Sequence, residues 1–412
     1  MSSEPGLRTL RIEGLAHLGA GISRDGGKVT FVPLTVPGDL VQARIVEEKS
    51  RFARARLDAV LEPSPDRVEP PCPYFGACGG CQWQHIAYPM QLRCKTQLVR
   101  EQLEHVGGLA GVDVRPIIGM EEPWGYRNSA RFTPSPDGQL GFQRFESHEV
   151  VAIDNCLILH PTLQELYASL EMDSAELSAL SVRAGIRTGE RMLVFEMDSE
   201  EPPELEVDIP ISCALALEDG RSMTLIGLSA LHEEVAGRRY QISPTSFFQV
   251  NTLGADRLVE IVAEALRPQG SERLLDLYCG VGLFGLALAG RVEEVLGVES
   301  APWAIADAVA NAEALDNVSF AEGLAEDALP EIEGVFDLAV VDPPRGGIHP
   351  AALQTLIERK PGRIAYVSCE PTTLARDCAA LTNAGYTLRW AQPVDMFPQT
   401  YHIETVAFLS RD

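Results

Sequence analysis

The sequence lacks the features that mark membrane and secreted proteins. Its 412 residues contain no apolar run near the roughly 18 residues that a membrane-spanning helix needs, and the mean hydropathy is close to zero. The segment Met1-Ser2-Ser3-Glu4-Pro5 has no basic stretch followed by an apolar one, as a secretory signal would have. We therefore expect a cytoplasmic protein without membrane contact, whose 45% hydrophobic residues can build two or three domains.

Basic residues are also scarce. The chain has 34 Lys and Arg against 59 Asp and Glu, which gives a formal net charge of −25. This balance is unusual for a protein that binds nucleic acid, because phosphates need a basic surface. The deficit is uneven, since residues 1–60 carry nine basic and seven acidic side chains. The N-terminal region is therefore the better candidate for contact with a polyanion, and the acidic remainder would repel misplaced phosphate.

The nine cysteines do not form a disulfide framework, because they are odd in number and unevenly spread. Three of them lie in one glycine-rich loop with the spacing C-x5-C-x2-C, namely Cys72, Cys78 and Cys81, and Cys156 is a distant fourth. Zinc usually takes two close pairs or mixed Cys/His sets, whereas a close trio with a remote partner suits a cubane iron–sulfur cluster. We expect a 4Fe-4S cluster, with zinc or no metal as the alternatives.

Residues 7–60 predict a small all-β unit. Short strand candidates alternate with glycine turns, which suggests a five-stranded, OB-like barrel. The stretch 49–56 interleaves basic residues with Phe52 and suits a platform for phosphates and bases, although a solvated basic edge strand explains it equally well. The strand candidates are Leu7–Leu15, Lys28–Val32, Asp39–Glu47 and Arg54–Val60.

Residues 63–250 predict a central region of mixed α and β structure. It begins in a proline-rich linker, and a helical stretch at Tyr88–His105 presents Cys94 as a helix-face thiol. Alternating polarity in 126–132 predicts a strand that carries Arg127 and Arg131 on one face, and Gly141–Phe145 could pair with it as a hairpin. The two arginines could line a groove for a nucleic-acid strand, but an ordinary half-exposed sheet accounts for the pattern as well. Some helix is expected around Thr162–Leu180, and an amphipathic one at Leu253–Ala265.

From Glu272 onward, strands and helices alternate in the manner of a Rossmann-like α/β domain. The strand Arg273–Leu277 runs into a G-x-G-x-x-G turn that begins at Gly280, and the next strand ends in Glu299, which could accept both hydroxyls of a ribose. These features fit a dinucleotide or S-adenosylmethionine. The strand 336–341 ends in Asp342-Pro343-Pro344, a turn typical of methyltransferases and rare in nicotinamide enzymes.

Two further segments end at chemically interesting residues. The apolar run 363–367 leads into Cys369 and then into a helix start, so this thiol is either a nucleophile or a buried structural residue. The segment Tyr401–Val406 predicts a strand that presents His402 and Glu404 on one face, where a structural ion pair is the alternative to a catalytic role.

Together these motifs resemble the RNA (uracil-5-)-methyltransferase family, in the 23S rRNA m5U methyltransferase-like branch with a TRAM domain and a 4Fe-4S cluster. The resemblance implies an N-terminal OB-like TRAM β-barrel at 1–62, a central α+β domain with the iron–sulfur loop at 63–250, and a C-terminal Rossmann-like class I methyltransferase domain at 251–412. It rests on the four cysteines and on Phe248–Asn251, Asp276–Gly282, Asp342–Arg345, Ser368–Pro371 and His402–Glu404.

The resemblance also implies residue roles. Cys369 would be the nucleophile and Glu404 the base, and the cluster would be structural or would help to hold RNA. Arg345 could steady the uracil or a phosphate, and His402 could orient Glu404. The residues that would hold S-adenosylmethionine are Gln249, Tyr278, Gly280, Glu299 and Asp342.

The expected chemistry fits these residue types. Uracil C5 attacks a methyl sulfonium only after a thiolate has added to C6, and a carboxylate must then remove the C5 proton. Three other functions remain open: methylation of an RNA base nitrogen, an iron–sulfur redox reaction with a nicotinamide, and RNA binding without catalysis. We expect ribosomal RNA as the substrate, with transfer RNA as the alternative, and a monomer without an obligate protein partner.

Overall fold

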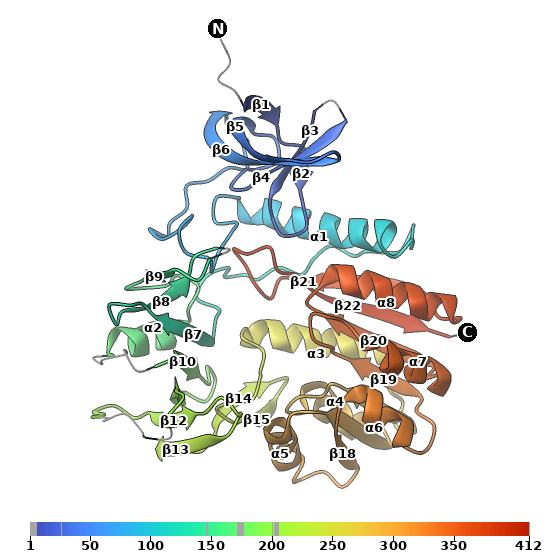
Figure 1. Cartoon of the computed structure of the whole chain (residues 1–412). Coiled ribbons are helices and arrows are strands. Elements are labelled where there is room, and N and C mark those ends of the chain that lie inside the picture. The colour runs from blue at the N-terminus through green and yellow to red at the C-terminus, as the bar shows by residue number, and fades with distance from the viewer. Residues whose placement is uncertain are drawn as a thin grey trace.

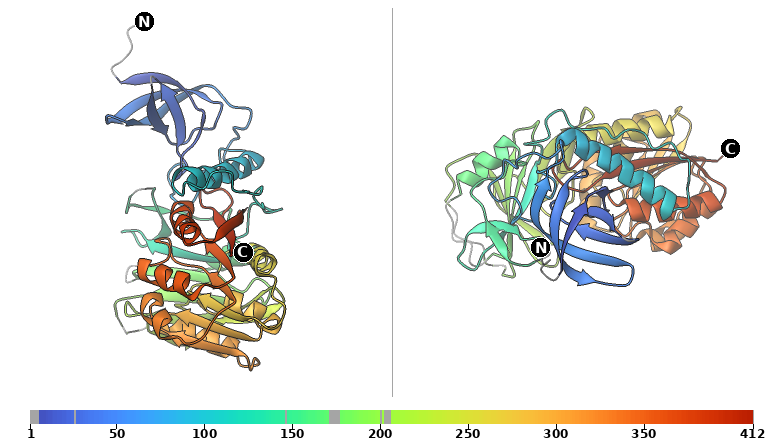
Figure 2. Two further views of the ribbon diagram at one scale, coloured as in Figure 1. Left: turned by 90° about the vertical axis from the view of Figure 1, so that its right-hand side faces the viewer. Right: turned by 90° about the horizontal axis from the view of Figure 1, so that it is seen from above.

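The computed structural model describes residues 6–25, 27–145, 147–170, 177–199, 201 and 206–411. A small N-terminal barrel lies above helix α1 (Tyr88–His105), and the central and C-terminal regions lie side by side below that helix (Figure 1). The side view in Figure 2 shows the same stacking, with α1 between the barrel and the rest of the molecule. No helix in the described ranges is long and apolar enough to cross a membrane.

The N-terminal barrel is one sheet with the strand order β1-β5-β6-β4-β3-β2, in which Leu10, Val32 and Val41 are almost fully enclosed. The predicted barrel is therefore confirmed, but with six strands in place of five. The run predicted as one strand from Leu7 divides in two, and β3 was missed because its polar Ser-Arg-Asp ending hides the alternation. The strands are β1 (Leu7–Arg11), β2 (Gly14–Leu15), β3 (Gly21–Asp25), β4 (Lys28–Val32), β5 (Leu40–Glu48) and β6 (Phe52–Glu62).

Two polar contacts dock the barrel on the regions below it. The fully buried Asp39 carboxylate accepts a hydrogen bond at 2.7 Å from Arg67, which lies in the segment that leads to α1. From the β2–β3 loop, His17 Nε2 lies 2.9 Å from Glu370 Oε1 in the C-terminal region. The barrel thus contacts the residue that directly follows Cys369.

Helix α1 has the predicted bounds. Pro89 occupies its first turn, where a missing N–H costs nothing. Leu98, Val99 and Leu103 pack into the same apolar cluster as Leu374 and Cys378 of helix α8 (Pro371–Asn383). Gln91 and Lys95 are also buried, which is uncommon for such side chains and reflects a polar contact described below.

The central region contains a seven-stranded sheet with the order β13-β12-β11-β10-β7-β8-β9, covered by helix α2 (Pro161–Ala168). The predicted β7–β8 hairpin is confirmed. Residues 171–176, within the stretch predicted to contain helix, lie outside the described residues. The strands are β7 (Ser129–Pro134), β8 (Leu140–Gln143), β9 (Val150–Ala152), β10 (Ala179–Ala184), β11 (Arg191–Glu196), β12 (Ser212–Ala216) and β13 (Ser222–Ile226); a separate ribbon consists of β14 (Leu231–Val235) and β15 (Arg238–Ile242).

The C-terminal region is a doubly wound sheet with the order β18-β17-β16-β19-β20-β22-β21. Strands β16 to β20 are parallel, and β22 is antiparallel to both of its neighbours. Strand β16 has the bounds that its apolar run predicted. The strands are β16 (Arg273–Leu277), β17 (Glu294–Glu299), β18 (Val318–Glu322), β19 (Leu338–Val341), β20 (Arg363–Ser368), β21 (Thr387–Val394) and β22 (Glu404–Ser410).

Helices cover both faces of this sheet, so its strands are buried on both sides. In β19, Leu338 and Val340 belong to one apolar cluster, whereas Ala339 and Val341 belong to the other. Helices α3 (Thr252–Leu266) and α4 (Leu283–Leu288), with the short 3-10 helix Ala289–Arg291, pack on the first face. Helices α6 (Ala325–Glu331), α7 (Pro350–Arg359) and α8 pack on the second, and α5 (Pro302–Asn311) follows β17.

Candidate active site

The predicted catalytic residues meet at one edge of the C-terminal sheet. Cys369 directly follows β20, and Asp342 directly follows β19, which is parallel to it. Strand β22 runs the other way, so its first residue, Glu404, lies at the edge where the parallel strands end. The pairing of Ser368 with Thr405 brings the nucleophile and base candidates within one residue of register.

Cys369 occupies the turn between β20 and α8. Glu370 caps the helix, since its carboxylate accepts a hydrogen bond from the N–H of Thr372 at 3.2 Å, and Pro371 starts the first turn. Burial raises the pKa of the Cys369 thiol to about 11, and the carboxylates of Glu404 and Asp342 act in the same direction against the cation of Arg345. In the free protein this thiol is therefore protonated at neutral pH.

Three carboxyl groups belong to the predicted site, of which Asp276 and Glu404 are buried and Asp342 is half-buried. Burial raises the pKa of Glu404 well above its usual range, and the neighbouring Asp342 raises it further, while Arg345 opposes them. Burial and the charge of Asp276 raise the pKa of Asp342 as well. Burial raises the pKa of Asp276 itself to about 7, although its Oδ2 accepts a hydrogen bond from the N–H of Gly285. These carboxyl groups can therefore bind and release protons near neutral pH, as acid–base catalysis requires.

The glycine turn after β16 is built for close approach of its backbone. Gly280 and Gly282 have φ angles of +54° and +91°, a region in which side chains are disfavoured. Glu299, at the end of β17, accepts hydrogen bonds from the N–H of Gly280 at 3.1 Å and of Ala301 at 2.8 Å. The non-glycine residue Tyr278 also adopts a positive φ, +66°. This turn and the carboxylate of Glu299 lie at the sheet edge where the sequence predicts a nucleotide-binding site.

Gln249, the remaining predicted contact to the methyl donor, is buried in the loop before α3. The loop is held by two buried side chains that sequence reasoning did not single out. Arg183 on β10 donates hydrogen bonds to the carbonyls of residues 243, 244 and 246, and Asp307 on α5 accepts bonds from the hydroxyls of Ser243 and Ser246. The only sequence signal for Arg183 and Asp307 was that each is a single charged residue within a mostly apolar stretch.

His402 differs from its predicted setting. It lies in the loop before β22, not on a shared strand face with Glu404, because the chain stays irregular through Ile403. Burial lowers the pKa of its imidazole to about 4, and Arg345 and Lys95 act in the same direction. Its ring packs against Tyr401 with the ring centres 4.4 Å apart. A neutral ring can donate or accept a hydrogen bond, but it brings no positive charge to Glu404.

The four predicted metal-ligating cysteines line one cavity. Cys72, Cys78 and Cys81 reach it from the loop before α1, and Cys156 reaches it from the segment before α2. Among the residues that the structure describes, no group of His, Cys, Asp or Glu side chains is arranged to hold a metal ion. The donor set still fits a cubane cluster, which takes four cysteines and spreads its ligands over four corners. Burial raises the pKa of the Cys81 thiol to about 12.

The two arginines predicted to share a strand face do not do so. Arg127 lies before β7, lines the cysteine cavity and donates from Nε to the carbonyl of Ser129. Arg131 lies on β7 and pairs with Glu196 at 2.7 Å. The chain bends at Arg127, which bridges to Leu159 and Asn251, and the strand begins only afterwards.

Comparison with known proteins agrees with this geometry. Residues 230–412 match the model of the family described as tRNA (Uracil-5-)-methyltransferase, and residues 8–57 match the TRAM domain. An uncharacterized RNA methyltransferase of Halalkalibacterium halodurans is 39% identical over 97% of this chain and 95% of its own length. Another, from Thermosynechococcus vestitus, is 37% identical over 97% of both chains.

A solved structure also matches along the whole chain. It is the Pyrococcus abyssi tRNA (uracil-54, C5)-methyltransferase in complex with S-adenosyl-L-homocysteine. The similarity covers 98% of this chain and 100% of that one, with 30% identity and a TM-score of 0.77. The fold class predicted from the sequence is thereby confirmed.

The raised pKa of Cys369 predicts its reactivity in the free protein. Alkylation by iodoacetamide at this residue, followed by peptide mass mapping, should rise about tenfold per pH unit up to pH 9, because only the thiolate reacts. The rate should show no plateau below pH 9, since the thiolate fraction keeps growing toward a pKa of about 11. Cys369→Ser provides the blank, and a plateau below pH 8 would contradict the electrostatics described above.

Proposed function

Because this chain belongs to the RNA (uracil-5-)-methyltransferase family, we propose that it transfers a methyl group from S-adenosylmethionine to C5 of uracil in RNA through a covalent adduct. The observation that carries the proposal is the placement of Cys369 and Glu404 at adjacent strand ends. Methylation of a base nitrogen needs no thiol, so this pair favours a carbon target.

Each residue has one task in the proposed reaction. Cys369 loses its proton to the carboxylate of Asp342, which leaves Glu404 free to act later, and the thiolate adds to C6, which makes C5 nucleophilic. C5 takes the methyl group, and S-adenosylhomocysteine leaves. Glu404 then removes the C5 proton, and the C5–C6 double bond re-forms as the thiolate is expelled. The net products are 5-methyluridine, S-adenosylhomocysteine and one proton.

The methyl donor is assigned to the sheet edge beside this pair. Gly280 and Tyr278 offer backbone at the turn after β16, and Glu299 offers a carboxylate to the ribose. Gln249 and Asp342 complete the proposed set from the loop before α3 and from the end of β19. Arg345 remains a proposed contact to the uracil or to a phosphate. In the free protein its positive charge opposes the rise in the pKa of Glu404.

The four cysteines are proposed to hold a 4Fe-4S cluster with a structural role. Their cavity lies beside Arg127 and is otherwise lined mostly by apolar residues. The segment that follows Cys81 continues directly into hydrogen bonds with the C-terminal region, from the N–H groups of Gln82 and Trp83 to the carbonyl of Gln399. A bound cluster would therefore fix a segment that the catalytic region contacts.

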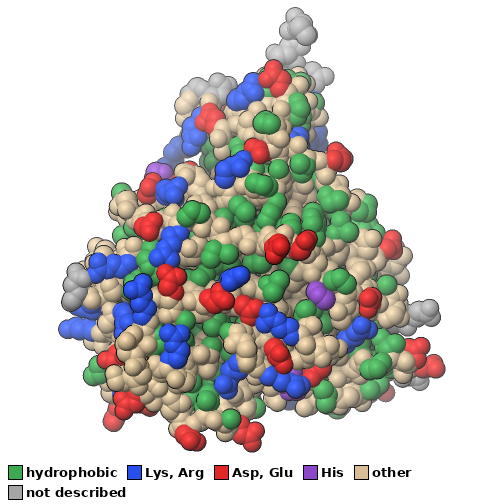
Figure 3. All heavy atoms as spheres, turned by 180° about the vertical axis from the view of Figure 1, so that it is seen from behind, with side chains coloured by type: hydrophobic (Ala, Val, Ile, Leu, Met, Phe, Trp, Pro, Cys, Tyr) green, Lys and Arg blue, Asp and Glu red, His purple; other side chains and the backbone are tan. Residues whose placement is uncertain are grey.

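The barrel is the proposed first contact of the RNA. Lys49 Nζ lies 5.3 Å from the centre of the Phe52 ring, which places a cation beside an aromatic face. Glu47 and Glu48 form ion pairs with several basic side chains of the barrel. RNA phosphates would therefore compete with these two carboxylates for the same basic side chains. Basic and acidic side chains are also interspersed over the face in Figure 3. We expect the chain to act as a cytoplasmic monomer that recognises RNA shape more than charge density.

Ribosomal RNA is the proposed substrate, as the combination of a TRAM barrel and a cysteine loop suggests. Transfer RNA is the second candidate, because the solved relative that matches the whole chain methylates uracil 54 of tRNA. Both candidates share the same chemistry at C5.

Substitution of the two catalytic candidates should separate the steps. Cys369→Ala should abolish release of tritium from [5-³H]uridine RNA while binding of RNA and S-adenosylmethionine persists. Glu404→Gln should instead accumulate a protein–RNA adduct that survives denaturing electrophoresis, because C5 keeps its proton. Turnover by Cys369→Ala, or prompt product release by Glu404→Gln, would contradict the assigned roles.

The metal content tests the proposed cluster. Protein purified without oxygen should be brown and contain about four irons per chain, as a cubane requires. Cys81→Ala should lose most of this iron, whereas Cys94→Ala, a half-buried thiol outside the cavity, should keep it. One zinc per chain would contradict the cluster.

The RNA target can be read from cells that lack this protein. Mapping of 5-methyluridine should show at least one site missing from 23S rRNA, with all tRNA sites retained. A missing tRNA site would select the second candidate, and an unchanged map of both RNAs would contradict the proposed function.

A further inference from the structure

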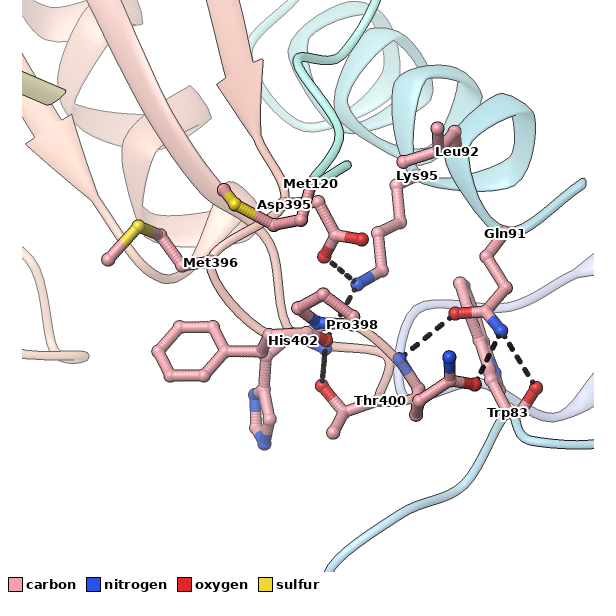
Figure 4. A network of polar contacts seen from close by, with 12 residues as sticks. Trp83, Gln91, Leu92, Lys95, Met120, Asp395, Met396, Pro398, Thr400 and His402 are labelled. Atoms are coloured by element: carbon pink, nitrogen blue, oxygen red, sulfur yellow. Dashed lines mark hydrogen bonds and ion pairs between the residues drawn. The ribbon is translucent and has the colours of Figure 1, made fainter. Parts of the chain in front are cut away.

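The loop between β21 and β22 connects Val394 to the candidate base. It comprises residues 395–403, carries His402 and ends at Glu404, the first residue of β22 (Figure 4). Val394 pairs with Glu404 in the strand ladder, so the two ends of the loop lie side by side. The position of Glu404 therefore depends on where this loop is held.

Groups from outside the loop hold its backbone. Four successive carbonyls, those of residues 396 to 399, accept hydrogen bonds from α1, from the segment after Cys81, from the central region and from the start of α3. The donors are Asn251 Nδ2 to residue 396 at 3.1 Å, Lys95 Nζ to residue 397 at 3.1 Å, the Tyr126 hydroxyl to residue 398 at 3.1 Å, and the N–H groups of Gln82 and Trp83 to residue 399 at 3.1 and 2.9 Å.

Lys95 is the charged member of this set. Its ammonium lies 2.5 Å from Asp395 Oδ1, and both side chains have an exposure of 0%. An apolar pair of similar volume commonly stabilises a fold at least as well as a buried ion pair. Stability alone thus does not call for charge here. The ammonium also fixes the geometry of the loop, because Lys95 Nζ donates hydrogen bonds both to Asp395 Oδ1 and to the carbonyl of Phe397.

Gln91 lies one turn before Lys95 on the same helix and holds the middle of the loop. Its Nε2 donates to the side chain of Gln399 at 2.9 Å, and its Oε1 accepts from the N–H of Gln399 at 3.1 Å. Gln399 has a φ of +70°, a strained conformation for a residue with a side chain. The hydrogen bonds from Gln91, which Figure 4 draws on α1, and those from the N–H groups of Gln82 and Trp83 keep this residue in place.

We propose that Lys95 and Gln91 are positioning residues for the reaction: they hold the loop 395–403 so that Glu404 meets the C5 proton of the uracil bound at Cys369. This inference rests on the proposed function, because it assigns Glu404 as the base. Both residues act through the loop, since their contacts with it are to residues 395, 397 and 399. Helix α1 lies between the barrel and the rest of the molecule, so it contacts both the proposed RNA-binding part of the chain and the loop before Glu404.

Three variants test the assignment. Lys95→Met leaves Asp395 as an unpaired buried charge, so the double variant Lys95→Met/Asp395→Asn serves as the version that keeps the fold. Glu272→Gln is the matched control, since it breaks the ion pair of Glu272 with Arg363 at the opposite edge of the same sheet. The measurements are thermal unfolding, kcat, KM for RNA and S-adenosylmethionine, and the fraction of protein–RNA adduct during turnover.

The double variant should lose kcat by about 10- to 100-fold, as a displacement near 1 Å of a reacting group does, with both KM values within about twofold of wild type. The adduct should accumulate, because removal of the C5 proton becomes the slow step. Glu272→Gln should lower the unfolding temperature without either change.

Two outcomes would overturn the inference. Wild-type kcat in the folded double variant, or an equal loss of kcat without adduct in Glu272→Gln, would make the Lys95–Asp395 pair merely structural. If the wild-type protein itself releases no tritium from [5-³H]uridine RNA, the proposed function fails first, and the inference fails with it.

Discussion

The reversed direction of one strand is the constraint on which the site depends. Strands β16 to β20 are parallel and end at one edge, where their following turns carry the candidate contacts to the methyl donor and Cys369. A further parallel strand would have placed its first residue at the far edge. Because β22 is antiparallel, Glu404 begins it at the near edge, one residue beyond the pairing of Thr405 with Ser368 on β20. The sheet itself thus supplies the relation between a nucleophile and a base.

That arrangement brings several carboxyl groups together at a largely buried edge of the sheet. Asp276 and Glu404 are buried and Asp342 is half-buried, and each raises the pKa of a neighbour, with Arg345 as the cation that opposes the rise at Glu404. A thiol in such a field stays protonated until a substrate changes its surroundings. Carboxyl groups with a pKa of about 7, as at Asp276, can take and return protons at neutral pH.

Local sequence patterns predicted much of this molecule, but they could not predict the contacts between residues far apart in the sequence. The bounds of α1 and β16 followed from periodicity and apolar runs, and Cys369 and Glu404 stood out as reactive residues next to strands. The predicted shared face of Arg127 and Arg131 was wrong because a bend precedes β7, and His402 lies outside its predicted strand because the chain stays irregular through Ile403. Lys95 and Asp395 are 300 positions apart in the sequence, so the residues around one of them give no indication that it pairs with the other.

The covalent adduct at Cys369 is the central claim, and RNA that contains 5-fluorouridine tests it most directly. Fluorine at C5 cannot leave as a proton does, so the reaction should stop after methyl transfer. Mass spectrometry of the trapped complex should find one peptide, containing Cys369, that carries a methylated fluorouridine nucleotide. A complex without the methyl group, an adduct at another residue, or full turnover without any adduct would contradict the account.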